Sequence, residues 1–227
     1  MKKFAFLFPD KHHFDIMIEW GSYGWENYYL KKKWNPLFAS IKTEEEREIL
    51  KQEFIGERNL QYSSYFFNML NKCIKERYRK KDFEVNWISL DNEPVSSNIE
   101  ILSEDKIILS GVDFKWGPKK KKTLSGYPDF SLLVDKIGDC EHLRIGGHVI
   151  WDCVSKLAKE AHERRLDVLV DEDLTDFFQS RISEPLFKID VYPSINFKKW
   201  YTQRGMVSHF EEFMNPRKDK PWFYQNY

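Results

Sequence analysis

The fold is decided by residues 146–173, which are GGHVIWDCVSKLAKEAHERRLDVLVDED. After the glycine pair, apolar residues recur at the i, i+3, i+4, i+7 spacing of one helical face: Val154, Leu157, Ala158 and Ala161. This spacing predicts a helix from about Asp152 to Arg165. The run Asp167–Val170 follows at once and is typical of a short buried strand. A helix that leads directly into such a strand indicates an α/β protein with parallel strands.

The rest of the chain supplies further elements of the same kind. Short apolar runs predict strands at 4–8, 83–90, 107–114 and 187–192, and periodicity predicts a helix at 63–80 and another that ends near Phe178. Thr43 and Glu46 form a capping box that opens a helix to about Gly56. We therefore expect a three-layer, Rossmann-like α/β domain with a mostly parallel central sheet.

Length and composition limit the class of protein. The chain has 227 residues, which suits one domain at 1–182, with an aromatic and helical excursion at 15–58, followed by a C-terminal extension at 183–227. Its 36 basic and 36 acidic residues balance, which argues against a dedicated nucleic-acid binder. Three cysteines exclude a disulfide scaffold. Without an apolar run of about 18 residues, a soluble cytoplasmic protein is expected.

Cys153 stands at the first turn of the helix that follows the glycine pair. Unpaired N–H groups at a helix start favour a thiolate, which is the nucleophilic form of cysteine. The glycines allow a sharp turn whose N–H groups could bind an oxyanion. The alternative is an inert buried cysteine behind a glycine turn.

The motifs resemble those of the isochorismatase-like cysteine hydrolases, which include the nicotinamidases. That family has a nucleophile turn G-x-x-T-x-x-C-V, and Gly147, Cys153 and Val154 stand at this spacing. Its catalytic lysine lies in K-x-x-x-S-[AG]-[FY], which is similar to residues 121–127, KKTLSGY. Its first strand ends in a catalytic aspartate followed by Phe, and here Asp10 is followed by Phe14. The resemblance covers about residues 3–14, 60–91 and 119–178.

The resemblance implies a mechanism and a set of site residues. Asp10 would accept the thiol proton, and the charge of Lys121 would hold the thiolate and the aspartate in position. Cys153 would attack the carbonyl carbon of an amide-like C–N bond to form a thioester that water hydrolyses. Lys120 or Lys122 could replace Lys121. The turn residues Gly147, Val149 and Ile150 would stabilise the oxyanion, with a cis peptide expected at Val149–Ile150. Residues expected to bind the substrate are His148, Phe14 and Tyr127.

The sequence departs from the family pattern in three places, which limits the chemistry to be expected of the site. Ile150 replaces the family threonine, and the spacing from Asp10 to Phe14 is one residue shorter than usual. The metal site of the nicotinamidases is not reproduced, because Asp91 is followed by Asn92, Glu93 and Pro94. We therefore expect no catalytic metal and no cofactor. The expected partners are a small-molecule substrate and, through aromatic loops, further copies of this chain, with neither a membrane nor nucleic acid.

Two other functions compete with the cysteine hydrolase. A non-catalytic member of the same fold would bind a ligand or a partner protein, which the Ile150 departure favours. A nuclease of the PD-(D/E)xK type would place Mg²⁺ between Asp91 and Asp113, with Lys115 near the scissile phosphate. We also expect Cys73 to be a core thiol on the helix 63–80, His12 and His13 to be surface residues, and Asp152 to be the helix N-cap.

Overall fold

The computed structural model describes residues 1–11, 13–14, 63–116, 122–182 and 184–227. Within these ranges, five parallel strands form one sheet in the order β3-β2-β1-β6-β7. The strands are β1 (Lys2–Leu7), β2 (Phe83–Ser89), β3 (Lys106–Leu109), β6 (His142–Gly147) and β7 (Asp167–Thr175). The expected α/β class with a parallel sheet is confirmed, and the arrangement is Rossmann-like.

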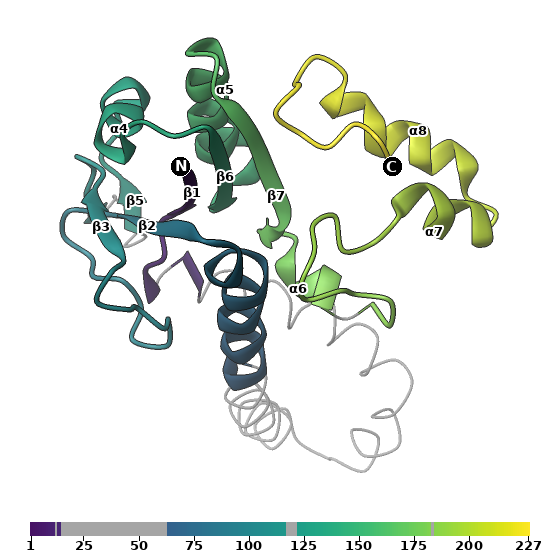
Figure 1. Cartoon of the computed structure of the whole chain (residues 1–227), viewed down its shortest axis with the longest axis horizontal. Coiled ribbons are helices and arrows are strands. Elements are labelled where there is room, and N and C mark those ends of the chain that lie inside the picture. Colours follow the sequence, from purple (N-terminus) through teal and green to yellow (C-terminus); the bar gives the residue numbers. More distant parts are fainter. Residues whose placement is uncertain (12, 15–62, 117–121, 183) are drawn as a thin grey trace, which may run out of the picture.

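Helices cover both faces of this sheet because successive side chains of the central strand point to opposite sides. Ala5 and Leu7 pack in one apolar cluster with α4 (Phe130–Ile137) and α5 (Ser155–Glu163). Phe4 and Phe6 pack in a second cluster with the helix 63–77 and α6 (Phe178–Ile182). Figure 1 shows the sheet between these layers, with α7 (Phe197–Gln203) and α8 (Val207–Met214) farther out on the side where β7 is the outer strand.

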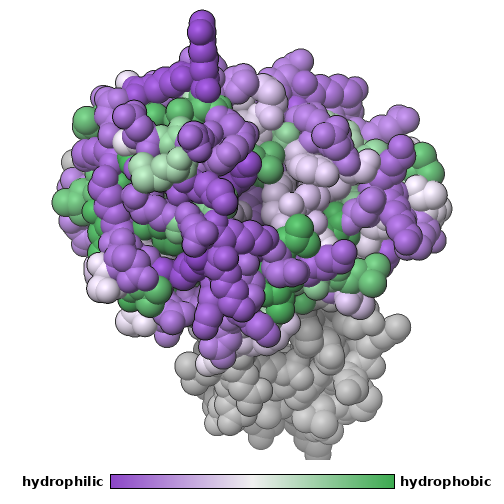
Figure 2. Space-filling model, in the orientation of Figure 1, coloured by the Kyte–Doolittle hydropathy of each residue, from purple (hydrophilic) through white to green (hydrophobic). Residues whose placement is uncertain are grey.

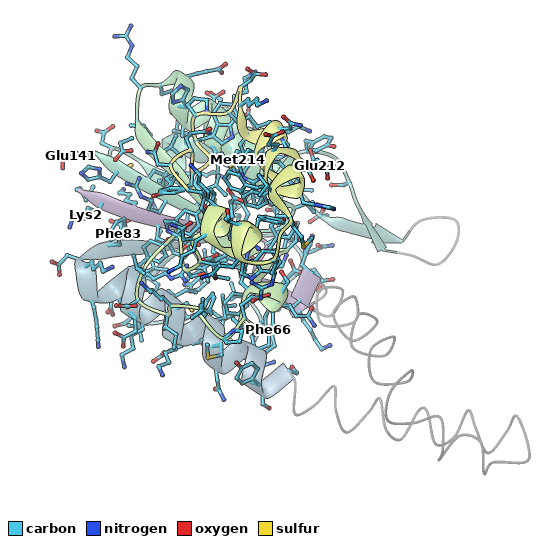
Figure 3. The ribbon with its side chains drawn as sticks, turned by 90° about the vertical axis from the view of Figure 1, so that its right-hand side faces the viewer. Lys2, Phe66, Phe83, Glu141, Glu212 and Met214 are labelled. Carbon is cyan, nitrogen blue, oxygen red and sulfur yellow. The ribbon has the colours of Figure 1, made fainter. Side chains whose placement is uncertain are left out.

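The direction of the strands fixes where a site can lie. Lys2, Phe83 and Glu141, which begin or precede β1, β2 and β6, lie together at one edge in Figure 3. Phe66, near the start of the helix 63–77, lies toward the opposite edge. The chain runs from β1 outward to β2 and β3, then crosses to β6 and β7 on the other side of β1. The order thus reverses between β1 and β6, and in such sheets ligands bind at the carboxyl ends beside the reversal.

Several predicted elements need correction. The expected strand at 107–114 is divided, because β3 ends at Leu109 and β4 (Phe114–Trp116) pairs with β5 (Lys122–Leu124) in a separate antiparallel hairpin. The expected strand at 187–192 is irregular chain. The helix expected from Asp152 begins earlier, as a π-helical segment η3 (Ile150–Val154) that continues into α5. The capping-box helix and the excursion at 15–58 lie outside the described residues.

The face of the molecule in Figure 2 is mainly polar over the described residues. On the face in Figure 2, hydrophobic residues are interspersed among hydrophilic ones. Among the helices of the described ranges, none has the length and apolar character needed to cross a membrane.

Candidate functional site

Four polar side chains meet beside the point where the strand order reverses. Asp10 and His13 follow β1, His148 follows β6, and Asp176 follows β7. We call Asp10, His13, His148 and Asp176 the switch-point cluster. Three separate strands bring these residues to the carboxyl edge of the sheet, as expected for a functional site in this fold.

Asp10 and His13 form the first pair of the cluster. The His13 ring nitrogen Nδ1 lies 2.8 Å from Oδ2 of Asp10, and the backbone N–H of His13 donates to Oδ1 over 3.1 Å. Burial of Asp10 opposes ionisation, but the hydrogen bond and positive charge of His13 outweigh it and lower the pKa of this carboxyl. Asp10 is therefore a stable carboxylate and a weak acceptor of protons.

His148 and Asp176 form the second pair. Nδ1 of His148 lies 3.1 Å from Oδ1 of Asp176, and the backbone N–H of Ile150 donates to Oδ2 over 2.8 Å. Burial lowers the pKa of His148 despite its carboxylate partner, so the imidazole is neutral. Since an ionised carboxylate only accepts hydrogen bonds, the proton of His148 sits on Nδ1 and leaves Nε2 as an acceptor. No donor reaches Nε2 from the described residues.

The two pairs are joined by their rings. The imidazoles of His13 and His148 stack with centroids 5.4 Å apart, and His13 also stacks on Phe8 at 5.2 Å. Phe6 and Phe14 meet the ring of His148 edge-on at 5.8 and 5.2 Å. Aromatic packing therefore fixes both imidazoles between the two carboxylates.

The turn that precedes Cys153 has the sharp geometry that its glycine predicts. Gly147 has a φ of +108°, and a Cβ at this position would lie 2.3 Å from the carbonyl oxygen of Leu7. The cis peptide of this turn joins His148 to Val149, one bond before the expected position. Glycine is required here because β1 and the turn touch through their backbones.

Cys153 lies in the apolar layer under this turn. It is only 2% exposed and packs in the cluster of α4 and α5. Burial, together with the negative charges of Asp152 and Asp176, raises the pKa of its thiol to about 12, although Lys156 acts in the other direction. At neutral pH this cysteine is a thiol in the folded chain.

The other predicted site residues lie in different surroundings. Phe14 is a core residue that packs edge-on against Phe66 and Phe67. Tyr127 is 60% exposed, and its hydroxyl donates to Asp152 over 3.0 Å. Lys121 lies outside the described residues, as do Lys119 and Lys120, whereas Lys122 begins β5. The convergence of Asp10, Lys121 and Cys153 therefore stays a prediction.

Three expectations about single residues can be compared with the structure. Cys73 is fully buried, as expected, and burial raises its thiol pKa to about 12. Asp152 is not a side-chain N-cap, because η3 starts after Val149 and the Asp152 carboxylate pairs with Lys156. His13 is not a surface residue, because its side chain is 11% exposed and bound to Asp10.

The residues of the nuclease alternative lie around the hairpin that follows β3. Oδ1 of Asp91 accepts the backbone N–H of Gly111 over 2.8 Å, and the carbonyl of Asp113 accepts from Ser125 over 2.8 Å. Lys115 lies on β4, which is separate from the parallel sheet. The described residues hold no group of three or more His, Cys, Asp or Glu side chains arranged for a metal ion.

Comparison of the chain with protein-family models, with curated proteins and with solved structures found no match.

Proposed function

We propose that this chain is a divergent relative of the isochorismatase-like cysteine hydrolases that binds a small molecule at the switch-point cluster without using Cys153 as a nucleophile. The observation that carries the proposal is the position of Asp176. Its carboxylate accepts the N–H of Ile150, one of the turn groups that a cysteine hydrolase would direct at the oxyanion. A resident carboxylate at this position repels the developing negative charge of an acyl-transfer intermediate.

Two further features support the same reading of the site. Asp10, the expected proton acceptor, has a lowered pKa because His13 stabilises its ionised form. Cys153 has a raised pKa because it is buried beside acidic groups. Transfer of a proton from the Cys153 thiol to the Asp10 carboxylate is unfavourable, because the pKa of the thiol is raised and that of the carboxyl group is lowered.

The reactivity of the three cysteines tests the proposal. We expect iodoacetamide at pH 7.5 to modify Cys153 as slowly as Cys73, because both thiols are buried with a pKa of about 12. Cys140 is only partly buried and serves as the reactive control within the same chain. Peptide mass spectrometry over a time course of the folded protein gives all three rates.

A second candidate is the cysteine hydrolase of an amide-like C–N bond. It is favoured by the turn at Gly147, which places Cys153 in the first turn of the helical segment at the carboxyl edge. In that reaction the Cys153 sulfur bonds to the carbonyl carbon, the amine leaves with the thiol proton, and water releases the acid from the thioester. Modification of Cys153 at least ten times faster than Cys140 would overturn the binding proposal in favour of this enzyme.

A further inference from the structure

We propose that the ligand of the switch-point cluster carries an amidinium or guanidinium group that binds the carboxylate of Asp176. This inference rests on the proposed binding function and adds the chemical class of the ligand.

Asp176 is the member of the cluster that a ligand can reach. Its side chain is 31% exposed, whereas those of Asp10 and His148 are 0% and 2% exposed. Val149, the residue after His148 in the turn, is 47% exposed and gives the surface an apolar flank. A charged carboxylate beside an exposed apolar side chain suits a cation with a hydrocarbon body.

The Asp176 carboxylate has the geometry to accept a forked donor. Among the described residues, Oδ1 receives one hydrogen bond from His148 and Oδ2 receives one from Ile150. A carboxylate has about four lone-pair positions, so each oxygen keeps one for a second donor. Two parallel N–H groups on a planar cation fit this pair of oxygens, and such bidentate contacts are stronger than single ones.

The charges of the cluster favour the same ligand class. Burial opposes ionisation of Asp176, but its interactions with His148, the N–H of Ile150 and the charge of His13 together outweigh this and lower its pKa, so it is anionic at neutral pH. Asp10 is a second carboxylate, and it is fully buried. The imidazole of His148 is neutral, and the positive charge of His13 pairs with Asp10, so one cationic ring faces two carboxylates.

A separate observation also indicates a ligand that donates hydrogen bonds. Nε2 of His148 is a buried acceptor, and no donor reaches it from the described residues. A buried polar atom without a partner costs about 1–3 kcal/mol and calls for an explanation. The donors of His13, His148 and Ile150 are already bonded to the carboxylates, so Nε2 and the remaining carboxylate lone pairs are acceptors in excess.

Three planar molecules of one shape and different charge test the inference on the full chain. Benzamidinium is cationic, benzamide is neutral and benzoate is anionic. We expect benzamidinium to bind at least ten times more tightly than benzamide, and benzoate not to bind, in calorimetric titrations at pH 7.5. Titration up to about 10 mM would detect millimolar affinity. The inferred ligand class would be overturned if benzamidinium did not bind in this range, or if benzoate bound more tightly.

Variants and a spectroscopic readout locate the contact. Asp176→Asn should weaken benzamidinium binding at least tenfold, whereas Asp152→Asn should leave it unchanged. Asp152 is a matched control because its side chain is 39% exposed and lies in η3, two residues after the Ile150 N–H that binds Asp176. If Asp176→Asn does not fold, amide NMR of the unmodified chain replaces it. The Ile150 N–H, which is bonded to Asp176, should then shift most, and shifts confined to other regions would contradict the inference.

The ligand titrations and the cysteine-modification experiment test different claims. Rapid modification of Cys153 would overturn the proposed function whatever the three isosteres do. Binding of benzoate in place of benzamidinium, with Cys153 inert, would overturn only the ligand class.

Discussion

Two aspartates on β7 share one arginine in the interior. Nη1 of Arg77 lies 3.0 Å from both oxygens of Asp171 and 3.0 Å from Oδ2 of Asp173. Asp171 also accepts the hydroxyl of Tyr78, whereas Asp173 has the more distant Arg181, at 3.8 Å. Burial and the charge of Asp171 raise the pKa of Asp173 to about 6.

This difference makes stability depend on pH in a defined direction. The folded chain holds the proton of Asp173 more tightly than the unfolded chain, whose aspartate titrates near 3.8. Ionisation of Asp173 therefore lowers the free energy of unfolding as pH rises from about 4 to 6, and the loss persists above 6. Asp173→Asn lacks this loss, so its stability relative to the natural chain should rise by about 1–3 kcal/mol between pH 4.5 and 7.5.

Urea unfolding at the two pH values measures this change. Asp135→Asn is the control, because the Asp135 side chain is 63% exposed and exposed ion pairs contribute little. An equal stability difference between Asp173→Asn and the natural chain at both pH values would contradict the prediction.

At the level of single elements, the sequence predicts those strands and helices whose patterns are regular. β1, β2 and α5 follow from apolar runs and helical spacing. β6 was missed because its sequence HLRIGG mixes charged residues with glycines, although it lies between β1 and β7. Gly147 is required by the close approach of Leu7 on β1 and Gly146 by that of Leu174 on β7, which only the three-dimensional packing reveals.

The same limitation explains which site residues were missed. The strand predicted at Asp167–Val170 stops before the acidic run Asp171-Glu172-Asp173, but β7 continues to Thr175 because each carboxylate has a buried partner. The acidic residue that follows the carboxyl end of β7 is therefore Asp176. A strand predicted to continue as far as Leu174 would have Asp176 as the first acidic residue after it.

The backbone contact at Gly147 gives a prediction for the turn. Gly147→Ala should destabilise the fold by about 2–6 kcal/mol, because the new Cβ meets the Leu7 backbone and φ is positive. Gly126→Ala is the matched control, since a Cβ there meets nothing within 4 Å. Thermal and urea unfolding of both variants checks this. A Gly147→Ala chain as stable as the control would show that the turn can rearrange.

At the scale of the whole molecule, the C-terminal residues hold the outer strand from both of its faces. Arg77 donates to the carbonyls of Lys188 and Ile189 over 2.8 Å on one face. On the other face Arg217, which is 1% exposed, pairs with the buried Glu172. The backbone N–H of Val170 also donates to the carbonyl of Trp222 over 2.8 Å. These contacts cover the edge of the sheet at β7, which limits pairing with other chains there.

The Arg217–Glu172 pair makes this attachment testable. Arg217→Met leaves the carboxylate of Glu172 buried without its partner, which should cost about 3–5 kcal/mol of stability. Glu172→Gln combined with Arg217→Met removes both charges and should recover most of that loss. A double-mutant cycle by urea unfolding measures the coupling, with Arg204→Met, from an exposed pair with Glu184, as the control. If the double variant were no more stable than Arg217→Met alone, the arginine would act through its packing on Phe213 rather than through its charge.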